Sequence, residues 1–345
     1  MRAESKDRRT WRFADSQQEW WHEQLTTLDR ELSWVARMRE VAVASTETEH
    51  AKARWSEAIE SIASSPKYAG QRWPSGERLT PQVGLLPLGE NPATGLWELV
   101  HLQSGTEPKI GADGRVLRDA EGRLSLTPEM GMVFVLLPGG RVPKDPSGPS
   151  QEKWIPDVEL VPFFLSKYEL THEQWDRLSV LKGVAYRKET AMVPANRISW
   201  DDISAIWPRE LGWSGFPSET QWEYGCRAGT TTRWWTGDDK RFVSVAANLG
   251  DSILPVGGLQ PNAFGLHDVH GNVYEWCGDS LAGSAAPRPG DGLRDEGVEL
   301  TSYRVLRGGS WDCSADNATS AYRLNGTPEY PNIHDGLRPA RGITP

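Results

Sequence analysis

Apolar residues near the N-terminus recur at the spacing of a helix. From residue 21 onward they alternate steps of four and three, at Trp21, Leu25, Leu28, Leu32 and Val35. Such a stripe lies along one side of an amphipathic helix. Ser16 and Glu19 stand just before it with the spacing of a capping box, which favours a helix start there. The pattern predicts a helix over residues 15–44.

A second helical pattern follows from about residue 47 and ends before Pro66. Thr46 and Glu49 have capping-box spacing, and the apolar positions are Ala51, Trp55, Ile59 and Ile62. We expect residues 1–68 to form an antiparallel helical hairpin. We expect the apolar stripe on the first helix to pack on the protein's own domain. Alternatively, it contacts a partner or is the remaining end of a larger architecture.

Residues 69–130 read as a small β-rich linker module. LTPQVGLLPLG at Leu79 is echoed by LTPEMGMVFVLLPGG at Leu126, and ATGLWELVHLQSG lies between them. Short apolar runs punctuated by Gly and Pro are typical of strands and turns. From residue 131, VELVPFFLSKYELT predicts a strand leading to a helix that Thr171 and Gln174 cap, and further helices start at Ser199 and Ser218. The fold class expected is α+β.

The C-terminal third has neither helical nor strand periodicity. GLHDVHGNVYEW begins at Gly265 and RGGSW at Arg307, and FPSETQWEYGCRAG precedes both from Phe216. In type, order and spacing these motifs resemble the sulfatase-modifying-factor, or formylglycine-generating enzyme, family. The resemblance implies a variant of the C-type lectin fold, rich in irregular loops, over residues 131–345. The 17 tryptophans are expected to anchor its irregular core.

The preceding segment is similar to the linker-like module before such domains in bacterial protein kinases. That resemblance implies a setting in bacterial signalling or defence. The chain itself shows no kinase phosphate loop, HRD or DFG motif.

Charge and hydropathy exclude several classes of partner. The net charge is −9, which argues against a nucleic-acid surface because phosphate binding needs clustered Lys and Arg. The sequence contains no apolar run of membrane-spanning length and no apolar signal-peptide core, so we expect a cytoplasmic protein without a membrane partner. The three cysteines have no closely spaced pair, which disfavours a disulfide framework or a structural zinc site.

The turn in GLHDVHGNVYEW is a candidate calcium site. Calcium takes six to eight oxygen ligands, and two carboxylates seven residues apart around a tight turn could supply several. The resemblance implies ligation by two carboxylates and two main-chain carbonyls, those of Asp268, Glu275, Gly271 and Val273. It also implies a second site at Asn248 and Asp251. Alternatively, the two acids cap backbone amides in the turn.

The copper site of the catalytic relatives is incomplete in this sequence. In the copper-dependent members two cysteines stand five residues apart after the GGS, and both thiolates hold Cu(I). The first position matches Cys313 but the second is Ala318. We therefore expect no copper site and no catalytic activity. The alternative is an oxidase acting on a substrate cysteine with altered metal ligation, in which Cys313 meets Cys277 or Cys226.

The stretch after RGGSW also resembles the ligand-binding region of lectin-like proteins diversified by retroelements. The resemblance implies framework positions, which hold the fold, at Arg307, Gly308, Gly309, Ser310, Trp311, Arg323 and Gly336. It implies ligand-binding surface positions at Asp312, Cys313, Ser314, Asp316, Asn317, Leu324, Asn325, Tyr330, Asn332 and His334. The function expected is recognition of a protein partner through these loops, with the N-terminal helices as a further docking element; otherwise they are ordinary solvated loops.

Overall fold

The N-terminal helices are present, but their junction differs from the expected one. The computed structural model describes residues 16–112, 114–119, 122–143, 157–179, 192–207, 215–281, 286–294 and 303–345. Helix α1 spans Ser16–Thr46 and α2 spans Glu49–Ser64. The predicted cap at Thr46 is wrong by two residues, because the Thr48 hydroxyl accepts the hydrogen bond from the Ala51 amide.

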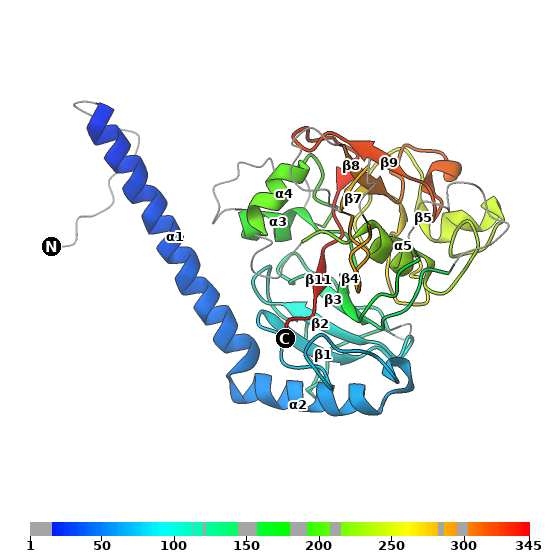
Figure 1. Cartoon of the computed structure of the whole chain (residues 1–345), viewed down its shortest axis with the longest axis horizontal. Coiled ribbons are helices and arrows are strands. Elements are labelled where there is room, and N and C mark those ends of the chain that lie inside the picture. Colours follow the sequence, from blue (N-terminus) through cyan, green and yellow to red (C-terminus); the bar gives the residue numbers. More distant parts are fainter. Residues whose placement is uncertain are drawn as a thin grey trace.

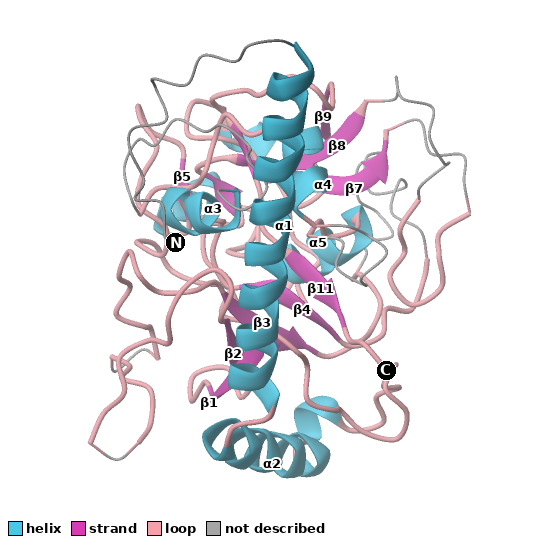
Figure 2. Cartoon of the chain, turned by 90° about the vertical axis from the view of Figure 1, so that its left-hand side faces the viewer, coloured by secondary structure: helices cyan, strands magenta, loops and turns pink. Residues whose placement is uncertain are grey.

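The predicted antiparallel hairpin is wrong. Helix α2 crosses the end of α1, and α1 projects along one side of the molecule (Figures 1 and 2). Ser45 fixes this elbow: its hydroxyl accepts from the Gly84 amide at 2.8 Å, and its carbonyl accepts from the Trp55 indole at 2.8 Å. Trp55 and Ile62 of α2 are buried in the main core, whereas the apolar stripe of α1 is exposed.

Residues 69–130 do not form a separate module, contrary to the expectation. They contribute β1 and β2 to a five-stranded antiparallel sheet of order β1-β2-β3-β4-β11. Its strands are Leu85–Glu90, Trp97–His101, Val133–Leu137, Phe163–Ser166 and Ala340–Gly342. A short 3-10 helix, η2 at Pro66–Tyr68, places the Tyr68 hydroxyl to donate to the Leu136 carbonyl at 2.8 Å. One core therefore runs through both segments.

The three predicted helices of the main domain are confirmed. They are α3 (His172–Ser179), α4 (Trp200–Ile206) and α5 (Glu219–Arg227). Ser199 and Ser218 each complete a capping box at the start of their helix. Helix α5 ends one residue before a left-handed Ala228, with φ of 44°, and Gly229 follows with φ of 94°.

The motifs GLHDVHGNVYEW and RGGSW contribute to a second, smaller sheet of order β10-β7-β8-β9. Its strands are Asp335–Gly336, Tyr274–Ser280, Arg304–Arg307 and Leu324–Gly326. A two-stranded parallel pair, β5 (Ala247–Asn248) and β6 (His270–Gly271), lies beside the 3-10 helices η6 (Lys240–Val245) and η7 (Ala315–Ala318). Long irregular segments join these short elements (Figure 1), so the expected mixed α+β architecture is confirmed.

Candidate ligand-binding face and the buried charges beneath it

The ten predicted surface positions all retain solvent exposure. Six are exposed and the other four, Cys313, Asn317, Leu324 and His334, are half-buried. Tyr330 is the most open of the large apolar side chains here, at 66 % exposure. Of the predicted framework positions, Trp311 and Arg323 are half-buried and the others are buried. The division into framework and surface follows the alternation of buried turns and exposed loop tips.

Asp312 and His334 meet at one end of this surface. The Asp312 carboxylate lies 3.2 Å from Nδ1 of His334 and accepts a hydrogen bond from the Ser310 hydroxyl at 2.6 Å. The rings of His334 and Trp311 lie 5.3 Å apart between centroids. Residues from both ends of the loop region therefore share one polar and aromatic patch.

Asp316 ties the loop to a neighbouring segment. Its two carboxylate oxygens lie 2.5 Å from Arg233 and 2.6 Å from Lys240. All three side chains are at least two-fifths exposed, so water screens these ion pairs and each adds little stability. Asp316 orients the loop more than it stabilises the fold.

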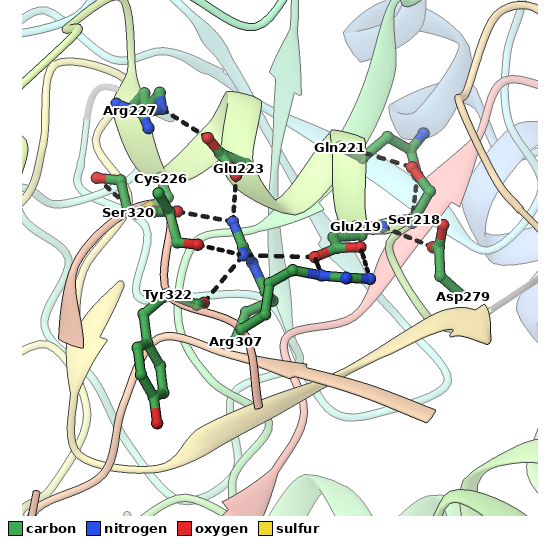
Figure 3. A network of polar contacts seen from close by, with 12 residues as sticks. Ser218, Glu219, Gln221, Glu223, Cys226, Arg227, Asp279, Arg307, Ser320 and Tyr322 are labelled. Atoms are coloured by element: carbon green, nitrogen blue, oxygen red, sulfur yellow. Dashed lines mark hydrogen bonds and ion pairs between the residues drawn. The ribbon is translucent and has the colours of Figure 1, made fainter. Parts of the chain in front are cut away.

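Arg307 holds the back of the loop from inside the protein. Its guanidinium donates to the carbonyls of Ser320, Ala321 and Tyr322 at 2.7, 3.1 and 2.9 Å (Figure 3). It also forms a buried ion pair with Glu223 of α5. Three main-chain carbonyls that would otherwise be orphaned in the core are thereby satisfied.

Glu219, at the start of α5, gathers three further contacts. Its carboxylate lies 2.5 Å from Arg294, 2.5 Å from Arg323 and 3.4 Å from Arg307. The Glu219 side chain is fully buried. Sequence reasoning missed Glu219 and Glu223 as organising residues. The available signal was a pair of acids four apart, hence on one face of a helix, among apolar neighbours.

Cys313 faces position 318, as the family pattern predicts. A Cβ added to Gly309 would lie 2.7 Å from the Ala318 Cβ and 3.0 Å from the Cys313 sulfur. The Cys313 sulfur accepts from the Ser310 amide at 3.3 Å and donates to the Ser314 carbonyl at 3.4 Å. Burial raises the pKa of this thiol, which disfavours the thiolate that binds metals.

The other two cysteines are placed in the core. The Cys226 sulfur lies 3.7 Å from the Ser320 hydroxyl and 3.9 Å from the His270 ring, and burial raises its pKa to about 12. Cys277 is fully buried in β7. All three cysteines are free. Among the contacts of the described residues, the structure gives Cys313 no thiol partner, so the alternative pairing with Cys226 or Cys277 gains no support.

Asp268 and Glu275 accept hydrogen bonds from different protein donors. The Glu275 carboxylate accepts from Arg338 at 2.8 and 3.1 Å and from the Trp222 indole at 2.6 Å. The Asp268 carboxylate accepts from the Gly257 amide at 2.7 Å. Glu275 therefore already accepts three hydrogen bonds from protein donors. The Gly271 amide donates to the Gly308 carbonyl, and the Val273 amide donates to Glu169.

Asp268 and Asn248 instead share a pocket of about 290 Å³. Burial raises the pKa of Asp268 to about 6, and it raises that of Glu169 well above its usual range. The positive charge of Arg338 lowers both pKa values, and it also lowers that of Glu275. One guanidinium therefore interacts with three buried carboxyl groups. A cation in the pocket would relieve this excess of negative charge. In the parts of the chain that the structure describes, no three His, Cys, Asp or Glu side chains are grouped as a metal site requires.

The comparisons with known proteins cover mainly the second half of the chain. The model of the family called "Sulfatase-modifying factor enzyme 1-like domain" matches residues 124–343. The chain is 27% identical over 243 residues to "Serine/threonine-protein kinase pkn1" of Chlamydia caviae, covering 61% of this chain and 38% of the kinase. It is 31% identical over 168 residues to the "Formylglycine-generating enzyme" of Streptomyces coelicolor, covering 42% and 51%.

Solved structures show the same kind of likeness. PvdO from Pseudomonas aeruginosa superimposes with a TM-score of 0.51 at 26% identity, over 62% of this chain and 95% of PvdO. Treponema denticola variable protein 1 gives a TM-score of 0.48 at 21% identity, over 61% and 96%. Among the described residues, no helix has both the length and the apolar character needed to cross a membrane.

Proposed function

Since the chain belongs to the sulfatase-modifying factor enzyme 1-like domain family, we propose that it is a member without oxidase activity that recognises a protein partner through the loops after Trp311. The observation that carries this proposal is at position 318. The Ala318 methyl stands beside the Cys313 sulfur where the copper-dependent pattern needs a second thiolate. The same loops present ten predicted contact positions on a framework that buried arginines hold in place.

The surface chemistry suits a protein ligand. An exposed Tyr330, exposed Asn325 and Asn332, and the Asp312–His334 pair combine a large amphipathic contact with adaptable hydrogen bonding. Because the framework below is rigid, such loops can hold a defined shape. We propose a setting in the bacterial cytoplasm, in signalling or defence; the likeness to a bacterial protein kinase, pkn1, supports the signalling setting. The chain spans 38% of that kinase's length, so the kinase activity itself is not carried over.

A structural calcium ion is the second part of the proposal. We place it in the pocket of Asn248 and Asp268, because this is where a buried carboxylate lacks a cation of its own. Glu275 contributes through Arg338 and not as a ligand. The ion would stabilise the turn between β5 and β6 and take no part in a reaction.

The first experiment is a turnover assay on the full chain. The protein is incubated with copper, a reductant, oxygen and a sulfatase-type peptide containing Cys, and the peptide mass is followed. We expect no conversion by the wild type or by Cys313→Ser. Conversion by the wild type that Cys313→Ser abolishes would overturn the proposal and establish the oxidase alternative.

The second experiment locates the binding face. Tagged protein is used to capture partners from cells of the source bacterium, and the captured protein is then titrated with purified variants. Tyr330→Ala should weaken binding at least tenfold, which corresponds to about 1.4 kcal/mol and is within the usual range for an exposed aromatic anchor. Leu117→Ala removes an apolar side chain that is 49% exposed on a different loop, and it should leave the affinity unchanged. Equal effects of the two variants would contradict the assignment of the face.

A further inference from the structure

Helix α1 carries an apolar stripe that no other part of the described chain covers. Its members are each at least half exposed: Trp21 at 54%, Leu25 at 61%, Leu28 at 50%, Leu32 at 60% and Val35 at 56%. Isolated exposed apolar residues are common on proteins, but a continuous row of them marks a contact surface. The row extends over about half of the length of α1.

The body of the protein packs on a different side of α1. Between residues 32 and 45 the half-buried and buried positions of α1 are Trp34, Arg37, Met38, Val41, Ala42 and Ser45. At 100° per residue this side lies roughly 130° around the helix from the stripe. Arg37 fixes the arrangement by donating to the Gln103 carbonyl at 3.2 Å. The stripe therefore lies on a different side of α1 from the one that contacts the body.

The spacing of the stripe is that of a coiled-coil seam. Steps of four and three from Trp21 to Val35 average 3.5 residues, which places Leu25 and Leu32 at one core position of a heptad. Trp21, Leu28 and Val35 occupy the other core position. We propose that α1 pairs with α1 of a second copy of this chain, in a parallel two-stranded coiled coil.

Charge favours the parallel direction over the antiparallel one. In the parallel pairing Gln24 of one copy lies beside Asp29 of the other, a neutral–acid contact. An antiparallel pairing of the same layers places Asp29 against Asp29 at its centre, and like charges at such positions are destabilising. A second copy fits the stripe because it brings an identical row of side chains at the same spacing.

The area is sufficient for a reversible dimer. The exposed parts of the stripe amount to on the order of 500 Å² per helix, so two helices would bury about 1,000 Å², which is the size of weak or transient interfaces. Such an interface is expected to dissociate in the micromolar range. Pairing would place two copies of the proposed recognition face on one particle, which raises the avidity for a repeated or clustered ligand.

The mass of the full chain in solution tests the pairing. Light scattering after size exclusion, at up to about 100 µM, should give twice the chain mass for the wild type. The double variant Leu25→Glu/Leu32→Glu should elute at the mass of one chain, because it buries four charges in the seam. Both leucines are exposed in the single chain, so melting of the body should not change.

A matched control carries the same added charge one residue further along. Thr26→Glu/Ser33→Glu lies on the exposed surface of α1 but outside the stripe, and it should keep the doubled mass. A wild type that stays at the mass of one chain over the whole concentration range overturns the proposal. So does a control that dissociates as fully as the stripe variant.

A cross-link tests the direction. In a Cys313→Ser background, Leu25→Cys should form a disulfide-linked dimer on mild oxidation, because Leu25 faces Leu25 in the parallel pair but faces Leu32 in the antiparallel pairing of the same layers. Ser33→Cys, outside the seam, should link at most one-tenth as much. A stable dimer that Leu25→Cys fails to cross-link overturns the parallel arrangement.

Discussion

Ala318 stands beside Cys313 at the position where a second thiol would complete a two-thiolate site. The Ala318 side chain is fully buried, and both residues approach the same point above Gly309. A single thiol with a raised pKa is a poor ligand for a soft cation, since the thiolate is the species that binds. At the scale of one residue, the proposed lack of oxidase activity depends on a methyl group in place of a thiol in this loop.

Restoring the thiol should restore metal binding. Ala318→Cys is expected to bind one Cu(I) per chain in competition with a chelator, while the wild type binds none, because two thiolates then flank Gly309. Ala315→Cys, on the same short helix but half-buried elsewhere, is the control and should behave as the wild type. Cu(I) binding by the wild type at equal strength would contradict the argument from position 318.

Asp268 is the residue on which the calcium proposal depends. In calcium the protein should melt several degrees higher than with a chelator, because the ion neutralises a buried carboxylate and binds the folded state alone. Asp268→Ala should lose this difference. Asp251→Ala, which changes an exposed acid nearby, should keep it. A wild type whose melting temperature is the same in calcium and in chelator removes the ion from the proposal.

Helix α5 is the element that supports the binding face. Its N-terminal turn carries Glu219, its next turn carries Glu223, and both carboxylates point at arginines from the C-terminal segment (Figure 3). Trp222, between them, donates to Glu275 of β7. One helix of nine residues therefore holds the loop, the second sheet and Arg338 in a single buried polar network.

Removing the charge of Glu219 should be costly. Glu219→Gln removes the carboxylate that pairs with Arg323 and with Arg294, which keeps only its longer contact to Asp279. Breaking a largely buried ion pair in this way costs about 3–5 kcal/mol of unfolding free energy. Asp316→Asn also removes a carboxylate that pairs two cations, but on the surface, and should cost less than about 1 kcal/mol. Denaturant unfolding of both variants makes the comparison; equal losses would show that the network at Glu219 is not a stabilising one.

At the scale of the whole molecule, the buried His101, His267 and His270 couple folding to the binding of protons. Burial lowers the pKa values of His101, His267 and His270 to about 3 in each case. Unfolding releases each ring to its ordinary pKa near 6.5. Between these two pKa values the unfolded chain binds more protons than the folded one. The three histidines therefore lower the free energy of unfolding as the pH falls from 6.5 towards 3.

His101 offers the clearest test of this coupling. It lies in β2 with its ring edge-on to Phe134, and the nearby Arg341 charge lowers its pKa further. Relative to the wild type, His101→Phe should gain about 2 kcal/mol of unfolding free energy between pH 7 and pH 5. His101→Gln is polar but is not protonated in this pH range. Its free energy of unfolding relative to the wild type should rise by the same amount between pH 7 and pH 5, whatever the difference is at pH 7. A difference from the wild type that stays constant over this range would contradict the assignment.

Local signals in the sequence were reliable. The capping pairs at Thr171, Ser199 and Ser218 each marked the start of a real helix, because a cap and its helix are within four residues of one another. The family motifs also indicated the α+β class and the division of residues 307–336 into framework and surface. The Thr46 cap failed because Thr48 offered the same chemistry two residues later.

By itself, then, the sequence determined the family, most of the helices and the exposed loop positions, since these depend on neighbouring residues and on recognisable motifs. Only the tertiary structure decided the angle between α1 and α2 and the ion pair between Glu275 and Arg338. It also decided that residues 69–130 and the main domain share one sheet. Glu219 and Arg323 are 104 positions apart, and Glu275 and Arg338 are 63 apart. Which buried acid meets which arginine depends on how the whole chain closes around them, and no local pattern carries that information.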